Sequence, residues 1–307
     1  MTEPAQPIRL IALDIDGTLV DQNLVVGERT RAAIGEAMRR GIAVSLVTGR
    51  MATSAMSFAE TLGLTGPLVA QQGALIRAIP EPGSRGVGRL LYHRPLRPEV
   101  TLDIVAWCRE RDLTPHFNHL EWMIVSSTEE RLEEYRLFVG DRLRIVPDIL
   151  ARAAHPVTKV VAIGDDVHSL DVLEEARVRF AGRAEVTLSH PRFLEFMAPG
   201  VSKGTAIRWL ARRLGVPLGQ AMAIGDQYND LEMIGEVGHG VAMPSAPAAV
   251  QAVARYVAPP VSEEGAAQMI ERIALGGGSG GGAAAGGAEV PAGGAGPADR
   301  GADVEPR

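Results

Sequence analysis

Residues Ile8 to Asp21 read IRLIALDIDGTLVD, and this segment indicates how both the fold and the site are built. Its continuous apolar run is typical of a strand that is buried on both faces. Asp14 and Asp16 follow where such a strand opens to solvent, and Gly17 permits a sharp turn. Acids at the carboxyl end of a parallel strand occupy the usual ligand position of an open α/β sheet. On these residues alone, Asp14 and Asp16 could equally serve only to end the strand and form the turn.

The bulk composition is that of a globular chain with room for two domains. It has 307 residues, of which 46% are hydrophobic. The formal net charge of -6 lacks the basic excess of nucleic-acid-binding proteins, so we expect no nucleic-acid partner. We find no basic leader with a long apolar core and no apolar run of transmembrane length. Neither export nor a membrane partner is therefore expected.

A single cysteine, Cys108, excludes an intramolecular disulfide and a zinc site built from cysteines. This cysteine usage suits a reducing compartment, and we expect a cytoplasmic protein. Cys108 lies in a helical pattern over residues 100–111, which predicts a buried thiol that behaves as a small hydrophobe and not as a nucleophile.

Strand and helix patterns alternate after the first segment. A helix is predicted over residues 30–40, and a buried strand over residues 42–47 ends in Thr48 and Gly49. A helix over residues 51–62 and a short strand over 68–70 continue the series. Strand, helix and strand in this order form a parallel pair with a right-handed connection. Asp14 and Thr48 should therefore lie at the same edge of one sheet.

The pattern changes near residue 80, where prolines and glycines accumulate. Shorter strands with alternating character follow at 89–93 and 122–126, with helices at 99–111, 129–139 and 169–176. We interpret residues 84–190 as an α+β domain inserted into a core formed by residues 1–83 and 191–275. From residue 276 to residue 307 the chain is mostly Gly, Ala and Pro, and we expect a disordered tail.

The parallel pattern resumes after the insert. Lys203 precedes a predicted helix over 205–214, and a strand over 221–224 is followed directly by Gly225 to Asp230. The remaining predicted elements are a strand at 240–243 and helices at 231–237, 246–254 and 263–275. The fold class expected from this order is α/β, with a doubly wound parallel sheet as the core.

If these strands are neighbours, four carboxylates meet at one sheet edge, namely Asp14, Asp16, Asp226 and Asp230. Four carboxylates in one place are costly unless a cation neutralises them. Mg²⁺ fits, because it binds through a few carboxylates together with water and substrate phosphate. Thr48, Lys203 and the turn amides near Gly17 and Gly49 would then face the negative charge of a phosphate.

At this point the sequence resembles the haloacid dehalogenase superfamily of phosphotransferases. The first family motif, D-x-D-G-T, stands here as Asp14 to Thr18, and the last, G-D-x-x-N-D, as Gly225 to Asp230. Thr48 matches the hydroxyl of the second motif and Lys203 matches the family lysine. All four motifs occur in order, which is a far stronger signal than any one of them.

The size and position of the insert resemble the type IIB members, the Cof-type hydrolases, whose inserted domain is a type C2 cap. Gln72-Gly73-Ala74 lies where these proteins usually have Asn-Gly-Ala, and Met243 to Ala246 resembles their Met-x-Asn-Ala. Gln72 and Ser245 each depart from the usual asparagine and each keep hydrogen-bonding capacity. The resemblance covers residues 8–275.

The resemblance implies a role for each matched residue. Asp14 would be the nucleophile that forms an aspartyl-phosphate, and Asp16 the general acid and base, with its backbone carbonyl on Mg²⁺. The expected metal ligands are Asp14, Asp16, Asp226 and Asp230, the last either ligating or orienting. The expected phosphate-binding residues are Thr48, Gly49, Lys203 and Asn229. Without the resemblance, Thr48 and Asn229 would be ordinary helix caps and Lys203 an exposed lysine at a helix start.

Two further patterns in the insert imitate functional sites. Gly164-Asp165-Asp166 resembles the start of the last motif but lacks the following Asn-Asp, so a helix N-terminus is the favoured interpretation. His116 and His119 could suggest a metal site, yet two histidines three residues apart rarely bind a metal without further ligands. We expect them to be surface residues, with substrate contact as the alternative.

The resulting hypothesis is a Mg²⁺-dependent phosphatase that acts on a small phosphorylated metabolite under a closing cap. A phosphosugar mutase, or a non-catalytic regulatory protein on the same fold, are the alternatives. Sugar phosphates, nucleotides, phosphorylated cofactors and phosphoglycolate all stay open as substrates, because no motif in the insert indicates one.

Overall fold

The computed structural model describes residues 7–276, apart from residues 82, 85, 129–131, 165–169 and 191–192. The predicted tail beyond residue 276, the two acids of the Gly164 to Asp166 pattern, and the first residues of the helices predicted at 129 and 169 lie outside the described residues. Within the described part, no helix is both long and apolar enough to cross a membrane.

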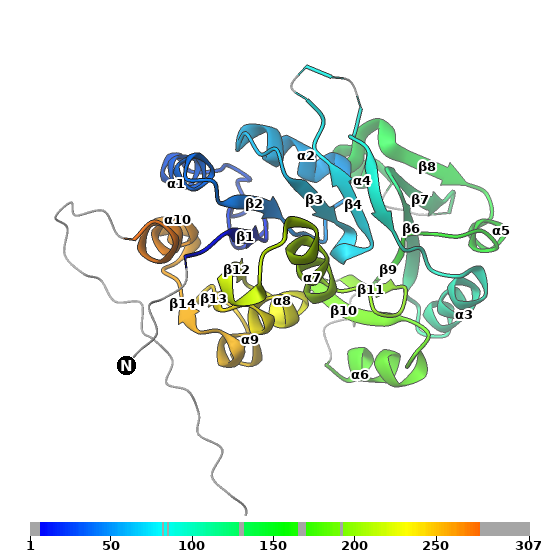
Figure 1. The fold of residues 1–307 in the computed structure, drawn as a ribbon. Coiled ribbons are helices and arrows are strands. Elements are labelled where there is room, and N and C mark those ends of the chain that lie inside the picture. The colour runs from blue at the N-terminus through cyan, green and yellow to red at the C-terminus, as the bar shows by residue number, and fades with distance from the viewer. Residues whose placement is uncertain are drawn as a thin grey trace, which may run out of the picture.

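A five-stranded parallel sheet forms the core, in the order β14-β13-β12-β1-β2 (Figure 1). Its strands are β1 (Leu10–Leu13), β2 (Ala43–Leu46), β12 (Ala221–Gly225), β13 (His239–Ala242) and β14 (Tyr256–Val257). Strand β1 lies between β2 and β12, with Leu10 paired to both Ala43 and Ala221. All four residues of β1 are fully buried, as a central parallel strand covered on both faces requires.

Helices cover both faces of this sheet. The residues of α1 (Glu28–Arg39), α2 (Ala52–Thr61) and α10 (Gly265–Met269) share one apolar cluster on the first face, where a π-helical turn (Ile270–Ala274) follows α10. The second face is covered by α7 (Lys203–Leu214), α8 (Leu231–Glu236) and α9 (Ala248–Val253). The carboxyl ends of β1, β2 and β12 therefore meet at one edge with helices on both sides, which is where ligands bind in such sheets.

A small antiparallel sheet extends this core. Its strands are β3 (Pro67–Ala70), β4 (Leu75–Ala78) and β5 (Leu90–His93). Strand β3 joins the parallel sheet through a bridge between Val47 and Val69. A 3₁₀ turn, η1 (Gln71–Gly73), links β3 to β4, and both Gln71 and Gln72 have positive φ, at 50° and 61°.

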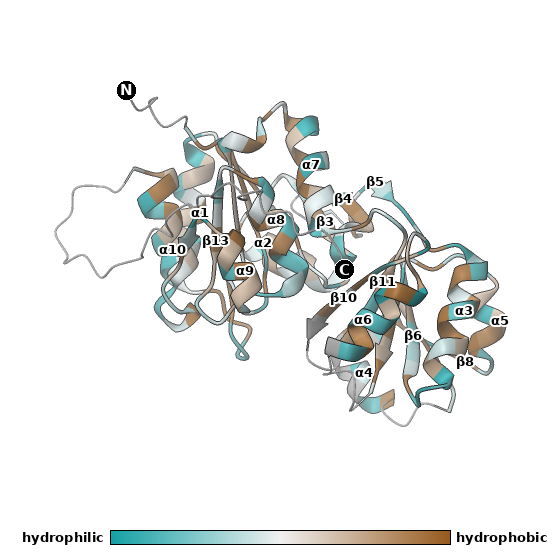
Figure 2. Cartoon of the chain, turned by 90° about the horizontal axis from the view of Figure 1, so that it is seen from below, coloured by the Kyte–Doolittle hydropathy of each residue, from teal (hydrophilic) through white to brown (hydrophobic). Residues whose placement is uncertain are grey.

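A six-stranded mixed sheet and its helices form a second lobe (Figure 2). The strand order of this sheet is β10-β11-β9-β6-β7-β8. Its strands are β6 (Thr114–His119), β7 (Trp122–Ser126), β8 (Leu143–Val146), β9 (Lys159–Ile163), β10 (Glu185–His190) and β11 (Phe193–Met197). Its helices are α3 (Pro98–Arg109), α4 (Leu132–Val139), α5 (Ile149–Ala153) and α6 (Leu170–Arg179). Strand β11 pairs with β9 and β10, so the second sheet continues past residue 190.

The two faces of the second sheet differ in chemistry. Alternate residues of β6, β9 and β11 join one large apolar cluster with α3, α5 and α6, and include Phe117, Val160 and Phe196. The other face carries the intervening residues, which include the buried polar side chains His116, Asn118, Lys159 and Glu195. Val161, Ile163 and Met197 are also buried on this face, so it is mixed in character, and its buried polar groups need hydrogen-bonding partners.

The α/β fold class with a parallel sheet is confirmed. Helix bounds agree with the predicted patterns to within about two residues for α1, α2 and α7. The strand predicted at 89–93 exists as β5, but it pairs with β4 and not with the six-stranded sheet. The expected burial of Cys108 in α3 is confirmed, since its side chain is fully buried.

Candidate active site

Lys203 is the centre of the acidic cluster. It is the first residue of α7, whose N-terminus carries a capping box formed by Ser202 and Thr205. Its Nζ lies 2.8 Å from Asp14 Oδ1 and 2.7 Å from Asp230 Oδ1, and its side chain is fully buried. A cation at a helix N-terminus is unfavourable by itself, because the backbone N–H groups there are also positive. The two carboxylates offset this cost, and they raise the pKa of Lys203 despite its burial.

Asp230 is held on both oxygens. Besides the contact of Oδ1 with Lys203, its Oδ2 accepts hydrogen bonds of 3.0 Å from the backbone N–H groups of Asp226 and Gln227. Asp230 is fully buried, in the short 3₁₀ turn η5 (Tyr228–Asp230) that precedes α8. A carboxylate with three donors has little capacity left, so this geometry favours an orienting role over direct metal ligation.

Asp14 and Asp226 complete the cluster from the ends of β1 and β12. Ligand oxygens of Asp14, Asp226 and Asp230 all lie within 4.8 Å of one another, and all three residues are buried. Burial, followed by the charge of Asp230, raises the pKa of Asp226 to about 7, against the lowering effect of Lys203. Burial likewise raises the pKa of Asp14, although Lys203 opposes it. Three buried acids against one lysine leave an excess of negative charge.

This excess fits a hard divalent cation. The donors are all carboxylate oxygens, the set that Mg²⁺ prefers, and they stand at the sheet edge where substrate phosphate would add further ligands. Gly17 leaves the room that this arrangement needs, because it has φ of 70° and a Cβ there would lie 2.2 Å from Asp226 Oδ2. Thr18 donates to Asp226 Oδ1 at 3.4 Å, which fixes the rotation of that carboxylate.

Asp16 points away from the other acids. Its side chain is 53% exposed and is bound by Arg50, with Nε 2.7 Å from Oδ2 and Nη2 2.5 Å from Oδ1. Arg50 itself packs over the ring of Phe58 and donates to Ser54. The structure therefore does not place the Asp16 carboxylate in the metal-binding cluster, and the sequence-based expectation for its backbone carbonyl stays a prediction.

Thr48, Gly49 and Asn229 gather around Gln72. Thr48 is buried at the end of β2, and its Oγ1 accepts a hydrogen bond of 3.1 Å from the backbone N–H of Arg50. A Cβ on Gly49 would lie 2.4 Å from Gln72 Nε2, and Asn229 Nδ2 donates to Gln72 Oε1 at 3.0 Å. The side chain of Gln72 therefore lies between Gly49 of the second motif and Asn229 of the last motif, which are both expected phosphate-binding residues.

Comparison with known proteins agrees with this geometry. The family model for haloacid dehalogenase-like hydrolases matches residues 11–270, which is most of the chain. The chain belongs to the haloacid dehalogenase-like hydrolases. It is 30% identical over 243 residues to the HMP-PP phosphatase of Cronobacter sakazakii, which covers 78% of this chain and 85% of that protein.

Solved structures of haloacid dehalogenase-like hydrolases have the same fold. One from Bacteroides thetaiotaomicron is 28% identical, with a TM-score of 0.72 over 87% of this chain and 99% of that one. A sugar phosphatase of subclass IIB is 22% identical, with a TM-score of 0.73 over 86% of this chain and 98% of that one. The expected superfamily, with its subclass IIB neighbours, and the expected phosphatase activity are confirmed.

Two charged residues of the hydrolase's second lobe were missed by motif analysis. Lys159 and Glu195 form a buried ion pair, with 2.6 Å between Lys159 Nζ and Glu195 Oε1. Lys159 also donates to the carbonyl of Gly49 at 2.9 Å, and Gln72 Nε2 donates to Glu195 Oε2 at 2.8 Å. The available signal was one charge inside each of two apolar strand patterns, TKVVAI and FLEFM.

The expectation that His116 is a surface residue was wrong. His116 is fully buried, and its Nε2 lies 3.1 Å from the Tyr135 hydroxyl. His119 is partly exposed and packs edge-on against His93.

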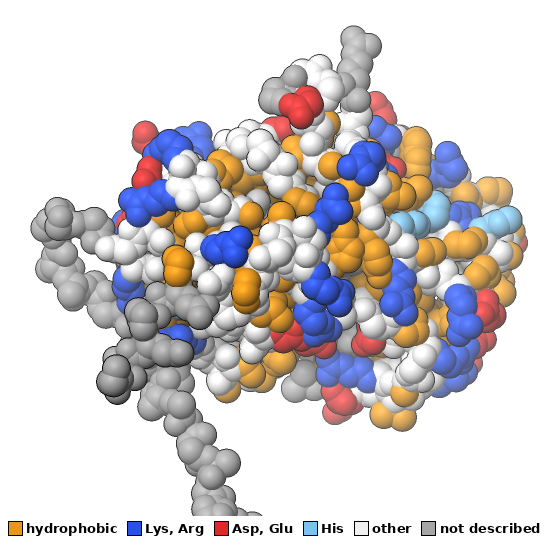
Figure 3. Space-filling model, viewed as in Figure 1, with side chains coloured by type: hydrophobic (Ala, Val, Ile, Leu, Met, Phe, Trp, Pro, Cys, Tyr) orange, Lys and Arg blue, Asp and Glu red, His pale blue; other side chains and the backbone are white. Residues whose placement is uncertain are grey.

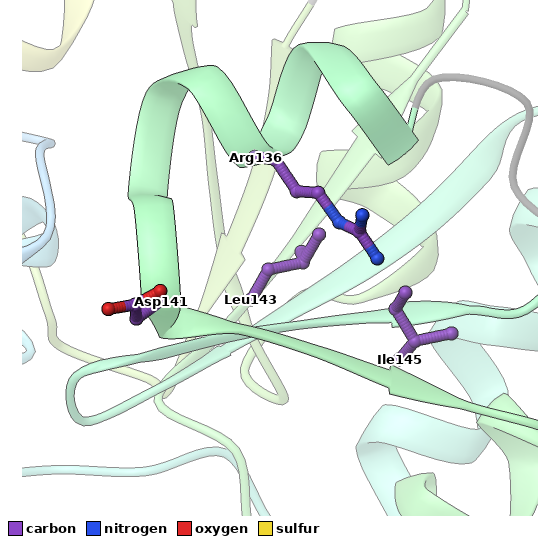
Figure 4. Close-up of a pocket in the computed structure, with 4 residues that line it drawn as sticks. All are labelled: Arg136, Asp141, Leu143 and Ile145. Carbon is purple, nitrogen blue, oxygen red and sulfur yellow. The ribbon is translucent and has the colours of Figure 1, made fainter.

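A hollow of about 500 Å³ lies elsewhere, beside β8, and is lined by Arg136, Asp141, Leu143 and Ile145 (Figure 4). It contains none of the motif residues.

Charge on the visible surface shows no strong segregation. In the view of Figure 3, basic and acidic side chains are spread over both lobes among apolar and polar ones. This distribution on one face agrees with the modest net charge of -6. The negative charge of functional interest is instead the buried cluster around Lys203.

Proposed function

We propose that this hydrolase is a Mg²⁺-dependent phosphatase that removes the phosphoryl group of a small phosphorylated metabolite through an aspartyl-phosphate. The observation that carries the proposal is the position of Lys203, whose Nζ contacts Asp14 and Asp230 while Asp226 completes the acidic cluster. A nucleophilic carboxylate needs to be ionised beside a dianionic phosphate, and a fully buried lysine supplies one of the charges that allow it.

In the first step an Asp14 carboxylate oxygen attacks the phosphorus atom of the ester. The bond from phosphorus to Asp14 forms and the bond from phosphorus to the leaving oxygen breaks, while Asp16 gives its proton to that oxygen. Lys203 keeps its proton and lies against Asp14, where it offsets the charge of the phosphoryl group. Thr48, Gly49 and Asn229 would donate to the phosphoryl oxygens.

In the second step the aspartyl-phosphate is hydrolysed. Asp16, now ionised, accepts a proton from water as the water oxygen attacks phosphorus, and the bond from phosphorus to Asp14 breaks. Inorganic phosphate leaves, and both acids return to their starting states. Both Asp16 oxygens accept hydrogen bonds from Arg50, so this contact has to open before Asp16 takes up the proton that it gives to the leaving oxygen. The side chain is 53% exposed, which allows proton exchange with solvent.

Mg²⁺ would be held by Asp14 and Asp226, with Asp230 orienting them, and would supply charge neutralisation at the transferring phosphoryl group. We place this chemistry in the first lobe, at the carboxyl ends of β1, β2 and β12, and substrate discrimination in the second lobe, which is built on the six-stranded sheet. On the second face of that sheet, Lys159 and Glu195 contact Gly49 and Gln72 of the first lobe, while His116 lies against Tyr135 of α4. The polar character of this boundary supports a polar leaving group such as a sugar or a heterocyclic alcohol.

The proposal is tested by release of inorganic phosphate from a panel of sugar phosphates, nucleotides and phosphorylated cofactors. Each compound is assayed with Mg²⁺ and with chelator, using wild type and Asp14→Asn. The amide keeps the size of Asp14 and removes the nucleophile, so we expect metal-dependent release in wild type and none in the variant. Circular dichroism checks that Asp14→Asn remains folded.

Substantial turnover by folded Asp14→Asn would refute the assigned nucleophile. Undiminished release in chelator would refute the metal dependence. Conversion of a sugar monophosphate into its isomer, without phosphate release, would show that the protein is a mutase, which returns the phosphoryl group to the sugar, and not a hydrolase.

A further inference from the structure

A chain of buried hydrogen bonds joins the second sheet to both phosphate loops of the proposed site. It runs from the Gly49 carbonyl to Lys159, Glu195, Gln72 and Asn229, with successive separations of 2.9, 2.6, 2.8 and 3.0 Å. Lys159 on β9 and Glu195 on β11 are 3% and 4% exposed. These two residues therefore connect the second lobe directly to the loop after β2 and, through Gln72, to the last motif.

The Lys159 end of the chain acts on Thr48. Lys159 Nζ binds the carbonyl of the Gly49–Arg50 peptide, and the N–H of the same peptide donates to Thr48 Oγ1 at 3.1 Å. Because a peptide unit is planar, fixing its carbonyl also fixes the direction of its N–H. A hydroxyl that already accepts this hydrogen bond keeps its own hydrogen for a phosphoryl oxygen. Lys159 thus sets the donor direction of Thr48 without contacting the phosphate.

The Glu195 end acts on Asn229. Glu195 Oε2 accepts from Gln72 Nε2, so the amide oxygen of Gln72 must face Asn229, from which it accepts. Asn229 Oδ1 is buried and has no hydrogen-bond partner among the described residues. Gln71 and Gln72 both adopt positive φ, which is uncommon for residues other than glycine.

We propose that Lys159 and Glu195 are positioning residues for phosphoryl transfer, which fix the donor groups of Thr48 and Asn229 in the orientation that the transferring group requires. The inference rests on the proposed function and adds to it a catalytic duty for the second lobe that is separate from recognition of the leaving group. Positioning contributes to the transition state, so its loss lowers kcat more than it raises KM.

The test uses the full chain and p-nitrophenyl phosphate with Mg²⁺. The double variant Lys159→Met/Glu195→Gln removes both charges together, so no lone buried charge remains. The matched control is Arg77→Met/Glu121→Gln, which removes another nearly buried ion pair, between β4 and the turn that follows β6. That pair contacts neither Gly49 nor Gln72.

We expect the Lys159/Glu195 double variant to lose about tenfold or more in kcat, with KM and the inhibition constant of inorganic phosphate changed by less than about threefold. The control is expected to keep kcat within about twofold, with melting temperatures recorded for both. An unchanged kcat, an effect confined to KM, or equal losses in both double variants would overturn the proposal.

The single variant Glu195→Gln keeps the test open if the double variant does not fold. Glu195 accepts on both oxygens, from Lys159 and from Gln72, and a carboxamide can accept on only one. We expect kcat to fall by about threefold or more at nearly constant side-chain volume, and an unchanged kcat in folded protein counts against the proposal. If wild type, like the Asp14→Asn variant, releases no phosphate, the result would instead contradict the proposed function itself.

Discussion

Arg50 donates to both carboxylate oxygens of Asp16, across 2.7 Å from Nε to Oδ2 and 2.5 Å from Nη2 to Oδ1. The pair joins the turn after β1 to the residue that follows Thr48 and Gly49, so it links the proposed general acid to the proposed phosphate loop. Arg50 could not be assigned from the sequence, because an arginine after Thr-Gly is as often solvated as bound. The planar guanidinium group of Arg50 donates two parallel hydrogen bonds, so it holds the Asp16 carboxylate in one orientation only.

Replacing Arg50 by lysine tests that orientation. Lys keeps the positive charge and loses the two-pronged contact, so we expect kcat to fall by about tenfold through poorer proton transfer by Asp16. The melting temperature should change little, because a partly exposed ion pair contributes about 1 kcal/mol or less. Steady-state kinetics and thermal unfolding of the same preparation measure kcat and the melting temperature. A kcat within about twofold of wild type would show that proton transfer by Asp16 does not need the two-pronged contact with Arg50.

Gly17→Ala should disable the acidic cluster by steric displacement. Its φ of 70° costs about 1 kcal/mol for a residue with a Cβ, and that Cβ would lie 2.2 Å from Asp226 Oδ2. We expect an activity loss of about a hundredfold and weaker stabilisation by Mg²⁺ in thermal unfolding.

Gly63→Ala is the matched control for this substitution. Gly63 has a similar φ of 64°, but a Cβ there would meet nothing within 4 Å. It should show the backbone cost and retain full activity. Equal activity loss in both variants would mean that backbone strain, and not contact with Asp226, is responsible.

The acidic cluster predicts an unusual pH dependence of stability in chelator. The pKa of Asp226 is about 7 in the folded protein against 3.8 for an ordinary Asp, so between these values the native state holds a proton that the unfolded chain has lost. The contribution of Asp226 to the free energy of unfolding should therefore decrease as pH rises from 6.5 to 8, by about 1 kcal/mol.

Asp226→Asn removes this titration, so its stability should be flatter over the same pH range and higher than that of wild type at pH 8. Urea unfolding at both pH values measures each difference. Equal pH dependence in the two proteins would place the titrating group elsewhere. Burial lowers the pKa of His93, to about 4, and also those of His119 and His239, so these histidines oppose the trend near pH 6.5, where the unfolded chain still titrates. The Asp226 effect is therefore read from the difference between wild type and Asp226→Asn.

Cys108 should report unfolding. Its thiol is fully buried in α3, and burial raises the pKa of Cys108 to about 12. The reactive thiolate is thus scarce and inaccessible in the native state. We expect no reaction with a thiol reagent in native protein over hours and one equivalent after denaturation. Rapid modification without loss of secondary structure would contradict the packing of α3 against β6 and β9.

The sequence was sufficient where chemistry sits at strand ends. Asp14, Lys203 and Asp226 could be brought together from motif order and from the rule that parallel strands end at one edge. Asp230 was expected beside them, either ligating or orienting, and its three hydrogen bonds favour the orienting role, which stays a prediction. Two of these bonds, from the N–H groups of Asp226 and Gln227, are local, whereas the contact with Lys203 joins residues 27 positions apart.

The sequence was insufficient where one lobe docks on the other. Lys159 binds the Gly49 carbonyl across 110 residues, and Asn229 binds Gln72 across 157. The strand patterns indicate that Lys159 and Glu195 are charged residues within apolar strands. They do not indicate which loop these side chains contact. The same limit applies to β5, whose partner β4 was not predicted, and to His116, whose burial depends on Tyr135.

The central place of β1 has a consequence for how this protein is made. The strand that carries Asp14 needs β2 on one side and β12 on the other, and Thr18 contacts Asp226, which is synthesised 208 positions later in the chain. During translation the first lobe must wait for its C-terminal strands, while the second sheet closes from a continuous stretch of chain. A nascent chain stalled before β12 would therefore hold a folded second lobe and no phosphatase site.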